Sequence, residues 1–265
     1  MPKFAAIILL TFVSFSVRAQ TWELGASVGG AGYMGDLNPT NPVKFSGASF
    51  GGYVKRNFNG YLSAKLNYTF AKVGAADSTS SNLQMRGRNL SFTSFVKELA
   101  IIGEFNFMNY IPDVTRNRYT PFIYLGVGVV GFNPQTTYNG HVYDLQPLRT
   151  ENEAKSYSKM ALTIPFGAGF KYNFTDKWTI IADAGYRQPN TDYLDDVSGV
   201  YPNPASLPNN LSRALSDRSG EKTGVYTGTP GSQRGDGRTH DTYFFVQLSL
   251  AFTFVTRKCY FELVG

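Results

Sequence analysis

The sequence has 265 residues, enough for one large β domain or two small ones. Glycine (27), tyrosine (17) and phenylalanine (21) are abundant, and only 17% of the residues are charged, a balance that favours a membrane-spanning barrel wall. The net charge of +6 comes without a dense basic cluster, so we expect no nucleic-acid partner. The single cysteine, Cys259, excludes an internal disulfide.

The first residues have the pattern of a secretory signal. Lys3 supplies a positive end, residues 4–17 are apolar, and Ala19 ends a cleavage site before Gln20. The apolar run is too short to cross a membrane comfortably as a helix. We therefore expect export through the Sec pathway to the outer membrane of a Gram-negative cell. The domains predicted are a signal peptide over 1–19, a barrel over 20–255 and a periplasmic tail over 256–265.

Eight segments alternate apolar and polar residues with the period of two that is typical of β-strands. They cover 22–34, 46–56, 61–72, 91–108, 119–132, 159–174, 178–187 and 242–254. The last is the clearest, because every second residue from Phe244 to Phe254 is apolar. Such a row has the roughly 9–11 residues that a tilted strand needs to cross a bilayer. In the fifth segment both rows are apolar, so its facing is ambiguous.

The connections between these segments alternate in length. Those after the second, fourth and sixth segments are the shorter set, and the last connection, 188–241, is the longest. Outer-membrane barrels have short periplasmic turns and long extracellular loops. The pattern predicts an all-β fold, an eight-stranded antiparallel up-and-down transmembrane β-barrel. A soluble lipocalin-like barrel has the same strand count, but it would need polar residues where the sixth and eighth segments carry phenylalanine and leucine.

Charged residues fall on the row that would face the barrel interior. They are Glu23, Lys65, Glu98, Glu104, Lys171, Asp183 and Arg187. Buried charges must be paired or hydrogen-bonded. If sequential strands are neighbours, Lys65 pairs with Glu104 and Lys171 pairs with Asp183. We therefore predict a lumen filled by ion pairs among Lys65, Glu104, Lys171, Asp183 and Arg187, without an open pore.

An acidic run follows the seventh segment. The carboxylates of Asp192, Asp195 and Asp196 are close enough in sequence to hold a calcium ion or to cap a short helix or turn. The spacing is not that of a regular calcium loop, so we favour capping and predict no metal and no cofactor. We treat the tripeptide 234–236, Arg-Gly-Asp, as a chance occurrence in a glycine-rich loop.

The only two histidines, His141 and His240, fall in or beside the long loops. With Asp236 or Asp241, such a histidine could serve a loop-borne hydrolase or acyltransferase. No nucleophile is placed beside either histidine by the sequence, and a solvated loop histidine is the default interpretation. We therefore expect no catalytic residues and no enzymatic activity.

Several motifs resemble one family of barrels. The opening, residues 22–25 followed by Tyr33-Met34-Gly35-Asp36-Leu37, is similar to that of the PorG-type outer-membrane barrels of Bacteroidota. The segment Thr191-Asp192-Tyr193-Leu194-Asp195-Asp196 is similar to the family's most recognisable stretch, and residues 241–245 are similar to its entry into the last strand. The motif residues are Tyr33, Gly35, Asp36, Asp192, Tyr193, Leu194, Asp195 and Asp196.

The resemblance implies a non-enzymatic component of the type IX protein secretion and gliding motility machinery. It implies that the barrel lies in outer-membrane lipid and anchors a periplasmic ring, formed by a lipoprotein of PorK or GldK type with its partner PorN or GldN. Two other classes stay open. One is a general OmpA- or OmpW-like surface barrel that acts as an anchor or adhesin, and the other is the loop-borne enzyme.

A partner on the periplasmic side must contact the inner rim of the barrel. The fourth connection carries Arg116 and Arg118, and the tail adds Arg257, Lys258, Cys259, Tyr260 and Phe261. Arginine and aromatic residues are frequent anchors of protein interfaces. We predict that these residues form the partner-binding surface.

Overall fold

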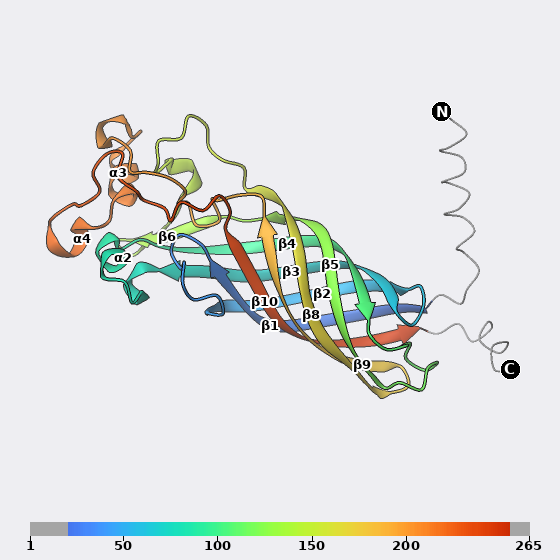
Figure 1. Ribbon diagram of the computed structural model, residues 1–265. Coiled ribbons are helices and arrows are strands. Elements are labelled where there is room, and N and C mark those ends of the chain that lie inside the picture. The colour runs from blue at the N-terminus through green and yellow to red at the C-terminus, as the bar shows by residue number, and fades with distance from the viewer. Residues whose placement is uncertain (1–20, 255–265) are drawn as a thin grey trace, which may run out of the picture.

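The computed structural model describes residues 21–254 and shows a closed barrel with a lobe of loops at one end (Figure 1). Eight antiparallel strands form the wall, which confirms the predicted fold. They are β1 (Thr21–Met34), β2 (Phe45–Asn57), β3 (Leu62–Ala76), β4 (Ser91–Asn106), β5 (Tyr119–Gly131), β8 (Met160–Thr175), β9 (Trp178–Pro189) and β10 (Thr242–Phe254). The predicted signal peptide and tail lie outside the described residues.

The first and last strands close the wall. Along β1 and β10, Trp22 lies opposite Phe254 and Met34 lies opposite Thr242, so the two strands pair over their whole length. Each wall strand pairs with its neighbours in chain order, with β5 beside β8 and β3 beside β4. A closed ring satisfies the backbone hydrogen bonds that an open sheet edge would leave exposed to lipid.

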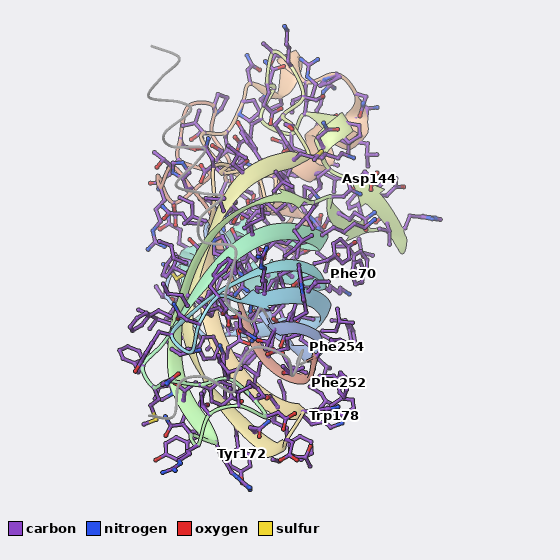
Figure 2. The ribbon with its side chains drawn as sticks, turned by 90° about the vertical axis from the view of Figure 1, so that its right-hand side faces the viewer. Phe70, Asp144, Tyr172, Trp178, Phe252 and Phe254 are labelled. Carbon is purple, nitrogen blue, oxygen red and sulfur yellow. The ribbon has the colours of Figure 1, made fainter. Side chains whose placement is uncertain are left out.

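Alternation along each strand sends apolar side chains outward and polar ones inward. In β8, Leu162 and Phe170 are exposed on the outer face, whereas Thr163 and Lys171 are buried. The structure also settles the facing of β5, in which Phe122 and Tyr124 point inward and Ile123 and Leu125 are exposed. Aromatic residues gather at the end that holds Thr21 and Phe254, here called the termini end. Figure 2, which faces this end, shows Tyr172, Trp178, Phe252 and Phe254 on the wall near it.

The long connections gather at the opposite end, here called the loop end (Figure 1). The longest, 190–241, carries two short helices. A hairpin of two short strands follows β5 in the chain, and its first strand pairs with the start of β4. These elements are α2 (Leu83–Arg88), α3 (Asn210–Ser216), α4 (Gly220–Thr223), β6 (Pro134–Tyr138) and β7 (His141–Asp144), with 3-10 turns η1 (Asp77–Thr79), η2 (Gln146–Leu148) and η3 (Pro204–Ser206). Within residues 21–254, no helix has the length and apolar character needed to span a bilayer.

The hydrophobic core lies at the loop end and joins the barrel to its loops. Inward residues of the wall such as Val96 and Phe245 pack with Leu194, Val197 and Leu215 from the longest connection. This cluster fills the mouth of the barrel. Part of the longest connection therefore folds over the lumen.

Candidate functional site

A buried ion-pair network fills the half of the lumen nearer the termini end. Its centre is Glu104, whose carboxylate lies 2.6 Å from Lys171 Nζ, 3.0 Å from Lys65 Nζ and 3.5 Å from Lys55 Nζ. Lys55 also pairs with Glu23 at 2.6 Å. All five side chains are at least nine-tenths buried. Each charged group of the network therefore has an oppositely charged partner, as buried charges require.

One predicted pair is wrong. Lys171 faces Ile181 across the β8–β9 ladder, whereas Asp183 faces Gly169, so Asp183 lies further towards the loop end. Lys171 instead reaches across the lumen to Glu104 and Asn106 on β4, with which β8 does not pair. The carboxylate of Asp183 accepts a hydrogen bond of 3.4 Å from the Tyr124 hydroxyl. The expected Lys65–Glu104 pair is present in the structure at 3.0 Å.

Sequence reasoning missed Lys55. It stands next to Arg56, so both rows of that strand carry a positive charge and the inward row could not be read directly. The signal that could have found it is the row Ser49, Gly51, Tyr53, Lys55, which is more polar than the row with Phe50 and Val54.

A second layer of charge lies nearer the loop end. Arg187 Nε lies 3.6 Å from Glu98 Oε2, which also accepts a 2.6 Å hydrogen bond from the Tyr243 hydroxyl. The Arg187 guanidinium lies over the ring of Phe245 at 4.3 Å. Across both layers, the buried charges of the wall strands are four acidic and four basic side chains: Glu23, Glu98, Glu104, Asp183, Lys55, Lys65, Lys171 and Arg187. The formal charges cancel, as expected of a filled interior rather than an ion path.

A cluster of carboxyl groups lies where the wall meets the loops, and we call it the acidic site. One carboxylate oxygen from each of Asp36, Asp192 and Asp241 lies within 4.8 Å of the other two. The Tyr33 hydroxyl is 2.8 Å from Asp241 Oδ1 and 2.5 Å from Asp195 Oδ2. The fold thus brings together motif residues separated by more than 150 positions in the chain.

Close backbone approach shapes the acidic site. A Cβ atom on Gly35 would collide with Asp241 Oδ1 and the Tyr33 hydroxyl, so only glycine fits beside them. Leu194 N donates to Asp241 Oδ2 at 3.0 Å, which fixes the second oxygen of that carboxylate. The motif residues Tyr33, Gly35 and Leu194 therefore position acidic groups, and their own side chains bring no charge.

Burial makes negative charge costly in the acidic site. It raises the pKa of Asp36 to about 7, although the backbone N–H of Asp236 donates to this carboxylate. Burial, followed by repulsion from the neighbouring carboxylates, raises the pKa of Asp195 and of Asp241 well above the ordinary range. Burial also raises the pKa of Asp192. The site therefore needs protons or a cation to balance its carboxylates.

The acidic run does not act as one group. Asp192 faces Asp36 and Asp241, whereas Asp195 Oδ1 accepts from Val197 N at 2.9 Å in a local turn. The Asp196 carboxylate accepts 2.6 Å hydrogen bonds from the hydroxyls of Thr150 and Tyr157. The preferred capping interpretation thus describes Asp195 only, and the three carboxylates do not converge on one point.

Comparison with known families identifies the chain. The family described as "Domain of unknown function (DUF6089)" matches residues 2–212, most of the sequence. The chain belongs to the DUF6089 family. The comparison with curated protein sequences gave no match.

Solved structures resemble this DUF6089 barrel in fold. The N-terminal barrel domain of Pseudomonas aeruginosa OprF is 13% identical, with 88% of this chain and 97% of that one covered and a TM-score of 0.38. Neisserial surface protein A is 10% identical, covering 89% and 97%, with a TM-score of 0.40. A major outer membrane protein of Thermus thermophilus is 13% identical, covering 89% and 100%, with a TM-score of 0.39.

The histidines of the DUF6089 barrel do not assemble the arrangement that a hydrolase would need. The ring nitrogens of His240 lie 2.8 Å from the Thr239 hydroxyl and 3.0 Å from Asn190 Oδ1, so its contacts are an adjacent threonine and an amide. His141 is exposed in β7. The tripeptide 234–236 is not displayed either, because Arg234 is buried against Glu151 at 2.7 Å.

Two of the predicted partner-binding residues, Arg116 and Arg118, lie within residues 21–254. Arg116 and Arg118 are exposed on the connection 107–118, whose other end is anchored by the buried residues Tyr110 and Ile111. The Tyr110 hydroxyl lies 2.9 Å from Thr179 Oγ1 on β9, which holds this connection across the termini end. The other predicted partner-binding residues, Arg257, Lys258, Cys259, Tyr260 and Phe261, lie outside the described residues.

Proposed function

We propose that this barrel is an outer-membrane anchor that docks a periplasmic assembly, in the manner of the PorG component of type IX secretion. The observation that carries the proposal is the filled lumen. Charge-balanced side chains and a hydrophobic cluster occupy the interior, so a transport path through the lumen has no support. A protein of this shape acts through its two ends.

The outer face of the wall supports the membrane location. Leucine, valine, isoleucine and phenylalanine side chains are exposed along every wall strand, an arrangement that is costly in water over so large a surface. Aromatic residues at the termini end match the girdle that barrels place at the membrane interface. Outer-membrane barrels have short periplasmic turns and long extracellular loops. We therefore orient the termini end towards the periplasm and the loop end outward.

The periplasmic rim supports the docking role. The connection 107–118 is held in place by Tyr110, and it presents Arg116 and Arg118 to solvent. Exposed arginines on an ordered turn are suited to a protein contact, because less backbone entropy is lost on binding when the turn is already fixed. The motifs 33–37 and 191–196 add the resemblance, which implies a ring lipoprotein of PorK or GldK type with PorN or GldN as the partner.

One further observation favours a second role. The loop lobe is ordered and buries polar as well as apolar residues, which suits a surface anchor or adhesin of the OmpA or OmpW kind. The two roles differ in which end meets a protein partner. A loop-borne enzyme receives no support from the contacts of His240.

Charge reversal at the rim tests the docking role. We expect the double variant Arg116→Glu and Arg118→Glu to insert as a heat-modifiable barrel while recovering much less of the ring lipoprotein in co-purification, with secretion reduced in parallel. The matched control is Arg86→Glu with Arg213→Glu, which makes the same charge change at exposed positions of the loop end. If the rim variant recovers the lipoprotein at wild-type yield, the rim arginines are not the docking site. If no secretion component is recovered even with the wild type, the anchor or adhesin role is favoured.

A further inference from the structure

We propose that the acidic site binds a calcium ion between Asp36, Asp192 and Asp241, and that this ion fixes the loop lobe to the barrel. Each of these residues offers a carboxylate oxygen, and the three oxygens lie within 4.8 Å of one another. Ligands about 2.4 Å from one calcium ion can span this separation. The proposal is independent of the docking role, because it concerns the opposite end of the molecule.

An unsatisfied acceptor supports the site independently of the clustering. Asp36 is 2% exposed, and its Oδ2 is buried without a hydrogen-bond partner among the described residues. Its other oxygen, Oδ1, accepts from the backbone N–H of Asp236. A buried carboxylate oxygen without a partner is costly in a folded protein, and a bound cation removes that cost.

The arginines around the site are engaged elsewhere. Arg88 forms hydrogen bonds of 2.7 and 2.8 Å with Asp77, and it reaches Asp36 only at the backbone carbonyl. Arg234 pairs with Glu151 at 2.7 Å. Neither guanidinium forms an ion pair with Asp36, Asp192 or Asp241 in the described part of the chain. The carboxylates thus converge without a basic side chain between them.

The donor set favours calcium over other metals. The three candidate ligands are carboxylates, with no histidine or cysteine among them, and hard oxygen donors suit calcium and magnesium rather than zinc. Calcium accepts six to eight oxygens in irregular geometry, whereas magnesium demands a near-ideal octahedron. Asp192 is only partly buried, so an ion can enter beside it and keep water molecules as its remaining ligands.

The positions of the ligands indicate what the ion does. Asp36 lies in the connection after β1, Asp192 follows β9, and Asp241 directly precedes β10. The ion would join both ends of the connection 190–241 to the first loop, next to the core residues Leu37 and Leu194. A ligand that binds only the folded lobe stabilises it in proportion to the logarithm of the ligand concentration. The lobe would thus be rigid in calcium-containing surroundings and looser without it.

Terbium luminescence on the full-length protein in detergent tests the site, with calcium as competitor. The Tyr33 ring, whose hydroxyl lies 2.8 Å from Asp241 Oδ1, can sensitise a bound terbium ion. We expect calcium-reversible luminescence in the wild type and affinity weakened at least about tenfold in Asp36→Asn and in Asp192→Asn. Asp144→Asn is the matched control, since it removes an exposed carboxylate from the same end and should bind as the wild type does. Equal affinity in all four proteins, or no binding at millimolar calcium, would overturn the proposal.

Limited proteolysis keeps the test decisive if a variant folds poorly. Trypsin has exposed targets in the lobe at Arg213 and Lys222. Removing calcium from the wild type with a chelator should speed cleavage there, and Asp36→Asn should be cleaved at one rate with or without calcium. If the carboxylates are instead neutralised by protons, calcium will not change wild-type cleavage and Asp36→Asn will slow it. That result would refute the calcium site.

Discussion

Replacing Glu104 with glutamine removes the negative charge that three buried lysines share. Lys171, Lys65 and Lys55 lie 2.6, 3.0 and 3.5 Å from its carboxylate, and among the described residues only Lys55 has another acidic partner within ion-pair distance, Glu23 at 2.6 Å. Breaking one buried ion pair from one side costs about 3–5 kcal/mol, because the remaining charge stays buried. The variant leaves Lys65 and Lys171 without an acidic partner, so we expect Glu104→Gln to lower the free energy of unfolding by at least about 5 kcal/mol.

The same geometry predicts that replacing Lys65 lowers the free energy of unfolding by less. In Lys65→Met, Glu104 keeps Lys171 and Lys55, so the loss is close to one charge-assisted hydrogen bond, about 1.5–3 kcal/mol. This loss is smaller than that of Glu104→Gln, since the acid is not left unpaired. The double variant Glu104→Gln with Lys171→Met restores a neutral interior, so it should be more stable than Glu104→Gln alone despite carrying two changes.

Urea unfolding of the refolded barrel in lipid or detergent measures these differences. Trp22 and Trp178 are exposed on the outer wall and report loss of the apolar surroundings by fluorescence. Lys97→Met, on the exposed face of β4, is the control and should unfold close to the wild type. The account of the lumen is refuted if Glu104→Gln unfolds at the wild-type midpoint, or if the double variant is less stable than the single one.

Three further predictions follow from the described contacts. Planar-bilayer recordings of the wild type should show no steady conductance, and a stable open level would contradict the filled lumen. On whole cells, cysteines replacing Ser80 and Gln135 should react with an impermeant thiol reagent, whereas cysteines replacing Asn59 and Asp176 should not; the reverse pattern would invert the topology. Burial raises the pKa of Asp196 from 3.8 to about 7 against the attraction of Arg234 and the hydrogen bonds from Thr150 and Tyr157, with Glu153 adding repulsion. The folded state then binds the proton more tightly, so stability falls as pH rises from about 4 to 7. Asp196→Asn should remove this penalty, on the order of 4 kcal/mol at most, and a thermal midpoint that gains as much at pH 5 as at pH 8 would contradict it.

Much of the wall was predictable because a bilayer requires apolar side chains along the outer row of each strand. The segment 242–254 was predicted with the bounds that β10 has, since one row is apolar throughout. The facing of β5 was not, because glycine and valine occupy both rows and carry little information about side. Pairing between neighbouring strands was enough to predict that Lys65 lies near Glu104, although Lys65 itself faces Ile102 in the register. A long side chain such as Lys171 can cross the lumen, which register alone does not reveal.

The loop end was harder to predict, for two different reasons. The β6–β7 hairpin had a usable signal, since Asn139-Gly140 takes the positive φ values of 49° and 78° that a two-residue hairpin turn requires. The acidic site had no local signal, because Asp36 and Asp241 are brought together only by closure of β1 against β10. Asp192 was noted in the acidic run and Asp36 through the resemblance, but neither observation showed that the two residues meet.

Site-specific photocrosslinking in intact outer membranes tests the central claim most directly. A photoreactive residue is placed at Asn117, on the rim between Arg116 and Arg118, and for comparison at Gln84, exposed in the loop-end helix α2. The account predicts that position 117 captures a periplasmic lipoprotein with the properties of a secretion ring and that position 84 does not. Capture of partners from position 84 alone, or of lipid only from position 117, would contradict the docking role.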